Sequence, residues 1–413
     1  MTSVVAAVEA AFARRTEPVL ALATQAPALA LACRDLAARF DRGGRLLVFG
    51  TGAGTTDAEH IAVEFVHPVL PGKRALPALS LAGDTATLTG VGARLGPDQV
   101  YAHQVAVLGR PADIALGLSA TGDCPDVRAG LAAARRAGLL TVALVGGDGG
   151  QLRAGAETDH CVLVLSGDPH VVKEGHVTAY HLLWELVHVF LDSPEAPQAA
   201  GGVERLYPFL YGGGTDSASV LDAAAESARQ KVHEIVDLRN EVARQQAPAV
   251  ADCGAVLARA FSSGATLLAL GNGGSSTDAQ DVVHTFLDPV PPRPALPALG
   301  LTNDVAVLTA LSNDIGFEVV FARQVEALGR AGDILVALST SGGSQNVLAA
   351  VEAAAGIGMV TIALAGYGGG RLAQQSGLQH LFAVPSASVH RVQEVQTTLY
   401  HLLWEATHAA NGD

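Results

Sequence analysis

RLLVFGTGAGTTDAEH occupies residues 45–60, and a closely similar stretch, TLLALGNGGSSTDAQD, occupies residues 266–281. Each begins with a short apolar run, passes through a glycine-rich turn and ends among hydroxyl-bearing side chains. A short apolar run of this kind is typical of a buried strand, and glycine permits the sharp turn that leads into a helix. The stretch therefore predicts a strand–turn–helix unit of an α/β fold that occurs twice in the chain.

The repeat extends well beyond this unit. ALPALSLAGDTATLTG (75–90) returns as ALPALGLTNDVAVLTA (295–310), and YHLLWE (180–185) returns unchanged at 400–405. The first pair of stretches lies 266 − 45 = 221 residues apart, and the later pairs lie 400 − 180 = 220 apart. A period this long is too large for a solenoid repeat and suits a duplicated domain.

Five apolar runs in each half alternate with longer, helix-like segments. In the first half these runs are 45–50, 75–81, 114–119, 139–146 and 160–166. Continuous apolar runs between helices indicate buried parallel strands that are covered on both faces. We therefore predict two doubly wound five-stranded parallel sheets, each a flavodoxin-like α/β/α sandwich with its ligand site beyond the carboxyl ends of the strands. The predicted domains span 1–195 and 215–413, and the Pro- and Gly-rich stretch 196–214 is the predicted linker.

Composition narrows the classes of partner. The chain has 413 residues and a formal net charge of −14, and no cluster of Lys and Arg stands out. Nucleic acid and anionic membranes are therefore not expected as partners, and no apolar run is long enough to span a bilayer. The four cysteines form no CxxC pair, which favours reduced thiols and a cytoplasmic protein.

Two glycine-rich loops of the second half carry the hydroxyl groups that favour phosphate binding. LGNGGSSTDAQ (270–280) and LSTSGGSQNV (338–347) each join a predicted strand to a predicted helix. Backbone N–H groups and a helix N-terminus attract anions at such a turn, and Ser339, Thr340, Ser341 and Ser344 can each donate to a phosphate oxygen. The loops lack GK[ST], which excludes a nucleotide P-loop. Ordinary helix capping by Ser and Thr is the alternative interpretation.

Together with RVQEVQTTLYHLLWE (391–405), these loops resemble the sugar isomerase (SIS) domain, in particular the phosphoheptose isomerase branch. The resemblance covers both halves. It implies a cytoplasmic oligomer that binds a phosphorylated sugar and converts sedoheptulose 7-phosphate to D-glycero-heptose 7-phosphate through an enediol. No cofactor is required, although zinc is bound in some members. The family's tetramer of single domains would become a homodimer of these fused chains.

The resemblance also implies site residues. The base is Glu64, which lies four residues after His60, and the histidine of the last helix is His181 in the first half and His401 in the second. His60, Glu64 and His181 form the implied metal site. The implied substrate-binding residues are Asn272, Ser275, Asp314, Ser339, Thr340, Ser341, Ser344 and Gln393.

The two halves depart from the family pattern at different places. The second half has Asp281 and Thr285 in place of the His and Glu, whereas the first half has Asp123 and Cys124 in its phosphate loop. A carboxylate at Asp123 repels phosphate. We therefore hypothesise that one working site combines the base of the first half with the phosphate loop of the second. Whether His181 or His401 accompanies Glu64 is left open, and a non-catalytic phosphosugar sensor or assembly factor is the alternative function.

Overall fold

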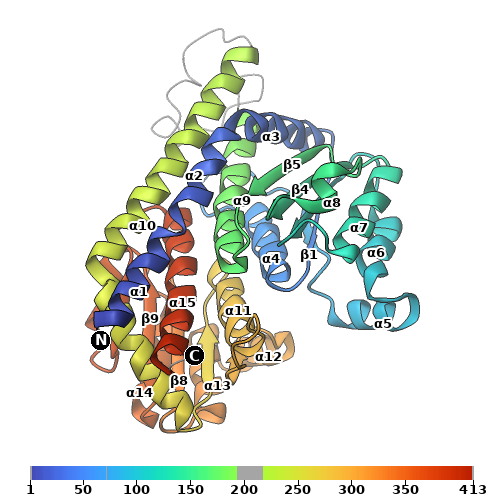
Figure 1. Ribbon diagram of the computed structural model, residues 1–413. Helices are drawn as coiled ribbons and strands as arrows, with labels where there is room; N and C mark the ends of the chain where they lie inside the picture. The colour runs from blue at the N-terminus through green and yellow to red at the C-terminus, as the bar shows by residue number, and fades with distance from the viewer. Residues whose placement is uncertain (1, 71, 193–216, 412–413) are drawn as a thin grey trace. The chain divides into compact units, whose positions relative to one another are not determined.

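A computed structural model describes residues 2–70, 72–192 and 217–411. The chain divides into two compact units. The first unit is Thr16–Val236, and the second unit is Met1–Arg15 together with Asp237–Asp413. Each unit contains one five-stranded parallel sheet with helices on its faces (Figure 1).

The sheet of the first unit has the strand order β2-β1-β3-β4-β5, with every neighbouring pair parallel. Its strands are β1 (Leu46–Gly50), β2 (Ala78–Ser80), β3 (Ile114–Ser119), β4 (Leu140–Gly146) and β5 (His160–Val164). Every residue of β1, β3 and β4 is buried, as expected for strands covered on both faces. This order and pairing confirm the predicted doubly wound sheet.

Two groups of helices cover the faces of this sheet. α4 and α9 contact each other and the strands on one face, and α6 and α7 pack together on the other (Figure 1). The helices of the first unit are α2 (Thr16–Thr24), α3 (Ala26–Asp41), α4 (Ala53–Val66), α5 (Thr85–Leu95), α6 (Val100–Leu108), α7 (Pro125–Arg136), α8 (Gly150–Ala154), α9 (Pro169–Leu191) and the beginning of α10 (Ser217–Ser262). Both α4 and α7 begin just after strand ends, so their N-termini lie at the carboxyl edge of the sheet.

The second unit repeats this topology with the order β7-β6-β8-β9-β10. Its strands are β6 (Leu267–Leu270), β7 (Ala298–Gly300), β8 (Ile334–Ser339), β9 (Val360–Ala365) and β10 (His380–Ala383). Its helices are α1 (Thr2–Ala13), the remainder of α10, α11 (Gly274–Leu287), α12 (Val305–Asp314), α13 (Val320–Leu328), α14 (Gln345–Ile357) and α15 (Val389–Asn411). The predicted duplication is therefore confirmed strand by strand.

α1 of the first half belongs to the second unit, and the beginning of α10, from the second half, belongs to the first unit. α1 packs on α15, where Arg15 Nη2 lies 2.8 Å from Glu405 Oε1 and Arg14 Nη2 lies 2.6 Å from the same oxygen. In the first unit, Lys231 Nζ of α10 lies 2.8 Å from Glu185 Oε2 of α9. Glu185 and Glu405 are the last residues of the two YHLLWE strings. Each of them therefore forms an ion pair with a basic side chain from the other half of the sequence.

This exchange places the unit boundaries elsewhere than the sequence predicted. The chain passes between units at residues 15–16, and again inside α10 at residues 236–237. The predicted domains, 1–195 and 215–413, kept each first helix with its own half. The predicted linker at 196–214 lies outside the described residues. Burial alone would raise the pKa of Glu405, but Arg15 and Arg14 outweigh it and hold that pKa below its ordinary value.

The last helix of each unit is buried almost all round. Every residue of α9 from Val171 to Val189 is buried, including two lysine or glutamate residues in its first turns and three histidines further along. Buried polar side chains require partners, which makes such a helix a natural carrier of a functional site. α15 has the same character.

Two further features are the apolarity of the helices and the state of the four cysteines. Among the described residues, no single helix has the length and apolarity to cross a membrane. One bent pair, Val4–Thr24 with Ala26–Asp41, meets those criteria jointly, with a bend of 62°. All four cysteines are unpaired with one another, and burial raises the pKa of the Cys253 thiol to about 12.

Candidate functional site

Three predicted residues of the first unit form one buried cluster. β1 leads through Gly52, whose φ of 60° suits glycine, into α4, which carries His60 and Glu64 one turn apart. α9 brings His181 to the same place. One ligand atom from each of the three side chains lies within 4.8 Å of the others, and His60 Nε2 is 3.6 Å from Glu64 Oε1. Glu64 therefore has His181 beside it, and no more than 3% of any of the three is exposed.

Aromatic side chains of the YHLLWE string enclose this cluster. The ring centroid of His60 lies 5.3 Å from that of Tyr180 and 5.5 Å from that of His181. Trp184 Nε1 donates a hydrogen bond of 2.8 Å to the Glu64 carbonyl oxygen. This bond ties the backbone of the predicted base to α9, which favours a preorganised site.

Lys173 anchors the same two helices nearer the carboxyl edge of the sheet. Its Nζ lies 2.6 Å from Asp57 Oδ1, 2.7 Å from Thr56 Oγ1 and 3.2 Å from the Ala53 carbonyl oxygen. Three acceptors match the three donors of an ammonium group. Lys173, Asp57 and Thr56 are not among the predicted site residues. The position of Asp57 and Thr56 one turn before His60 on α4 was a usable signal for them.

The chemistry of the cluster suits a divalent metal. Two imidazoles and one carboxylate form the mixture of ligands found in catalytic zinc sites, which keep a further position for water or substrate. His60, Glu64 and His181 offer this set within 4.8 Å and away from bulk solvent. The predicted metal residues thus fit such an ion by type and proximity.

The equivalent place in the second unit holds different chemistry. Asp281 stands where the first unit has His60, and Thr285 stands where it has Glu64. The Tyr400 hydroxyl donates 2.6 Å to Asp281 Oδ2, and His401 Nε2 lies 3.5 Å from the same oxygen. Burial raises the pKa of Tyr400, and the charge of Asp281 raises it further, so the phenol keeps its proton and acts as a donor.

The predicted phosphate loop of the second unit lies at the carboxyl end of β8. Ser339 ends the strand, and Ser344 is the N-cap of α14 but makes no capping hydrogen bond. The two hydroxyl oxygens instead lie 3.3 Å apart, while Thr340 is half-buried and Ser341 is exposed. Gly342 has φ of 62°, and a Cβ there would lie 2.2 Å from the Gly369 carbonyl oxygen. Ser344 is therefore not used for capping, whereas Ser341 Oγ accepts a 3.2 Å hydrogen bond from the Gly343 N–H, and phosphate binding by this loop stays a prediction.

The matching loop of the first unit is filled by its own side chains. Ser119 Oγ lies 3.1 Å from Cys124 Sγ. Asp123 Oδ1 accepts a 2.9 Å hydrogen bond from the Gln151 backbone N–H, near the start of α8. The Asp123 carboxylate thus occupies the backbone donor of Gln151, and its negative charge repels a phosphate. The sequence indicated only that Asp123 repels phosphate. The structure adds that this side chain holds the loop to the start of α8.

The remaining predicted substrate residues are distributed around the second unit. The Asn272 amide exchanges two 2.9 Å hydrogen bonds with Asn346, which ties the first glycine loop to α14. Ser275 is buried in the first turn of α11, and Gln393 is buried in α15 two turns before His401. Asp314 is the last residue of α12 and is exposed.

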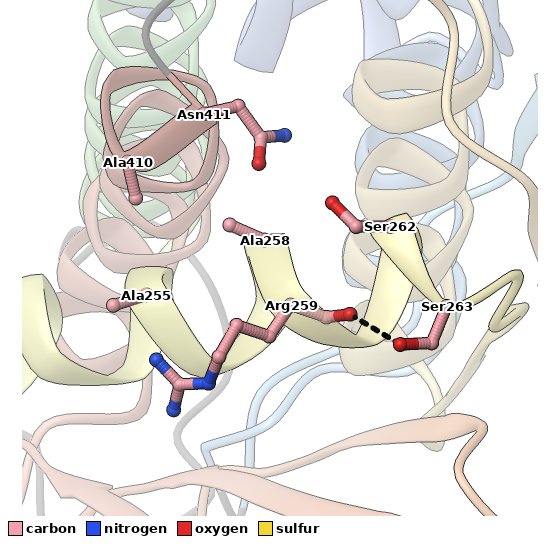
Figure 2. A pocket seen from close by; sticks show the side chains of 7 residues that line it. All are labelled: Ala255, Ala258, Arg259, Ser262, Ser263, Ala410 and Asn411. Atoms are coloured by element: carbon pink, nitrogen blue, oxygen red, sulfur yellow. Dashed lines mark hydrogen bonds between the residues drawn. The ribbon is translucent and has the colours of Figure 1, made fainter.

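A pocket of about 400 Å³ lies elsewhere in the second unit, between the ends of α10 and α15 (Figure 2). Figure 2 shows Arg259, Ser262 and Ser263 on α10 and its end, with Ala410 and Asn411 above them and the Arg259 guanidinium pointing away from these two residues. α10 ends just before β6 begins, so this pocket lies at the amino edge of the sheet. Ligands of doubly wound sheets bind at the opposite, carboxyl edge, and none of the predicted site residues lines the pocket.

Comparison with known proteins supports the same reading of the fold. The SIS domain family profile matches residues 12–146 and 231–366. A phosphoheptose isomerase from Desulfovibrio desulfuricans is 45% identical over 191 residues, which are 46% of this chain and 88% of that protein.

Several solved structures match nearly the whole chain, and two of them illustrate the likeness. The C-terminal domain of glucosamine-fructose-6-phosphate aminotransferase from Francisella tularensis has a TM-score of 0.59 at 9% identity and covers 96% of both chains. Tagatose-6-phosphate ketose/aldose isomerase from Escherichia coli has a TM-score of 0.57 at 12% identity and covers 97% of this chain and 93% of its own. At these identities the likeness shows the fold alone. With two profile matches and two sheets of one topology, the chain belongs to the SIS domain family and carries two copies of that domain.

Proposed function

We propose that this protein is a sugar-phosphate isomerase that exchanges aldose and ketose forms through an enediol. The buried cluster of His60, Glu64 and His181 carries the proposal, because it brings a carboxylate within 4.8 Å of two imidazoles. The similarity to a phosphoheptose isomerase at 45% identity supports it.

The chemistry assigned to the first unit is proton transfer. Glu64 removes the carbon-bound proton beside the sugar carbonyl. A histidine moves the hydroxyl proton, because its pKa lies near the operating pH of most enzymes. His60 and His181 both lie close enough to Glu64 for this role. If a divalent metal is held by these three residues, it supplies a positive charge that stabilises the developing enediolate.

The chemistry assigned to the second unit is phosphate binding. The loop from Ser339 to Ser344 offers hydroxyls and backbone N–H groups at a helix N-terminus, without an opposing carboxylate. The first unit has Asp123 at the matching loop, and the second has Thr285 at the matching base position. We therefore infer that turnover depends on residues from both units.

Sedoheptulose 7-phosphate is the substrate that we propose, with D-glycero-heptose 7-phosphate as product. The support is the name shared by the relatives at about 40% identity, such as those from Desulfovibrio desulfuricans and Halorhodospira halophila. We also propose a cytoplasmic homodimer of these two-domain chains, which light scattering can test.

The test is incubation of the purified full chain with sedoheptulose 7-phosphate in deuterated water, followed by NMR of the sugar. An isomerase that forms an enediol yields aldose product that carries deuterium at the carbon next to the carbonyl. Binding of the sugar phosphate by calorimetry without product or exchange would contradict the proposal. That result would favour the alternative, a phosphosugar sensor, for which Asp281, Thr285 and Asp123 are the supporting observations.

A further inference from the structure

The buried centre of the second unit is a rebuilt copy of the metal-type cluster in the first. The repeat aligns Asp281 with His60 (281 − 60 = 221), Thr285 with Glu64 (285 − 64 = 221) and His401 with His181 (401 − 181 = 220). Both centres lie between the helix after the first strand and the last helix of the unit. Only the residue types have changed, so the two centres form a natural internal comparison.

The change removes metal ligands and supplies internal hydrogen-bond partners. Thr285 replaces a carboxylate with a neutral hydroxyl. Asp281 replaces an imidazole with a shorter carboxylate, and its Oδ2 accepts 2.6 Å from the Tyr400 hydroxyl while facing His401 Nε2 at 3.5 Å. These three side chains are each 1% exposed. The protein itself thus supplies this carboxylate with a hydrogen-bond donor and a neighbouring imidazole.

From this geometry we propose that Asp281 seals the centre of the second unit against metal. In the first unit, two histidines and a glutamate offer three ligand atoms within 4.8 Å, whereas in the second unit Asp281 Oδ2 accepts from Tyr400 and faces His401. The chain accordingly takes one divalent metal ion, in the first unit, although it carries two copies of the fold. This inference concerns the donor sets and holds whichever sugar is the substrate.

The first experiment counts metal. The full chain is stripped with a chelator, loaded with Zn²⁺ or Co²⁺, separated from excess ion and analysed by elemental mass spectrometry. We expect one ion per chain, and the visible absorption of the Co²⁺ form reports its coordination. His181→Ala is expected to remove the ion, whereas His401→Ala keeps the count at one. No ion in the unsubstituted chain, two ions, or loss of the ion in His401→Ala would each overturn the inference.

The second experiment reopens the sealed centre. Asp281→His together with Thr285→Glu recreates the donor set of the first unit, and that unit shows that the fold accommodates a histidine beside the equivalent Tyr180. We expect this double variant to bind two ions per chain. Asp281→Asn with Thr285→Val is the matched control, which keeps one ion. If the double variant folds, as judged by circular dichroism, and still binds one ion, Asp281 is not what excludes the second. Because the readout is metal content, its outcome is independent of whether sedoheptulose 7-phosphate is turned over.

Discussion

The two units share a topology and an identical six-residue string, yet they surround that string with different chemistry. In the first unit, His181 of YHLLWE lies with Glu64 and His60. In the second, His401 lies with Asp281 and Tyr400. The predicted phosphate loops differ as well. The loop of the second unit carries serine hydroxyls, whereas in the first unit Asp123 accepts a backbone hydrogen bond within the corresponding loop. The comparison shows that the two copies keep one scaffold while the side chains around the shared string differ.

The largest effect is expected at the base. Glu64→Gln removes the proton acceptor but keeps the size of the side chain, so we expect kcat to fall by about 10²–10⁴-fold. Thr285→Val, at the matching position of the second unit, is expected to change kcat less than about twofold. Steady-state kinetics of both variants decides the point, and equal losses would show that the two units are not divided in this way.

The exchanged helices give the next effect. Arg15 is 1% exposed, and Arg15→Ala leaves Glu405 short of one buried cation. Removal of one partner of a buried ion pair costs about 3 kcal/mol of the free energy of unfolding. Lys231→Ala is the matched change in the first unit and should cost about 1 kcal/mol, because Lys231 is more exposed. Denaturant unfolding measures both, and an unchanged midpoint in Arg15→Ala would contradict the exchange.

Buried His176 should make the stability of the first unit depend on pH. Burial, together with the charge of the nearby Lys173, lowers the pKa of His176 to about 3, and a hydrogen bond to the Val145 backbone opposes this shift only in part. The unfolded chain therefore takes up this proton first as pH falls. Its contribution to stability is complete above about pH 6.5 and is lost as pH falls from there toward 3, by about 2 kcal/mol between pH 7 and 5.

The second unit has Gln396 at the equivalent position, so the change His176→Gln copies a residue that the fold already accommodates. We expect this variant to lose about 2 kcal/mol of pH dependence between pH 7 and 5. Thermal unfolding of both proteins at the two pH values measures it. An unaltered pH dependence would show that His176 becomes protonated without unfolding.

The smallest expected effect concerns the phosphate loop. Ser341→Ala removes one donor to a charged ligand and should raise the Kd for a sugar phosphate about tenfold, with kcat at saturation nearly unchanged. Thr121→Ala is the matched change in the first unit and should leave the Kd as it was. Calorimetric titration with sedoheptulose 7-phosphate separates these outcomes, and a larger effect from Thr121→Ala would reverse the assignment of the two loops.

The sequence predicted the sheets well because period, apolar runs and glycine turns are local signals. It also predicted that His60 and Glu64 share a helix face and meet a YHLLWE histidine, but it left open whether that histidine is His181 or His401, and the structure brings His181 to them. It did not predict the helix exchange. Arg15 and Glu405 are 390 residues apart, and nothing in their spacing shows which last helix a first helix covers. The Tyr400–Asp281 bond escaped for a similar reason, because a changed residue reveals a lost role but not its new partner.

The division of labour between the units is tested most directly by measuring Kd and kcat for sedoheptulose 7-phosphate side by side in Glu64→Gln and in Ser341→Ala with Ser344→Ala. The account predicts that Glu64→Gln binds the sugar phosphate with nearly the original Kd and loses kcat. It predicts that the loop variant loses affinity and recovers kcat at saturating substrate. Loss of binding in Glu64→Gln together with full affinity in the loop variant would contradict the account.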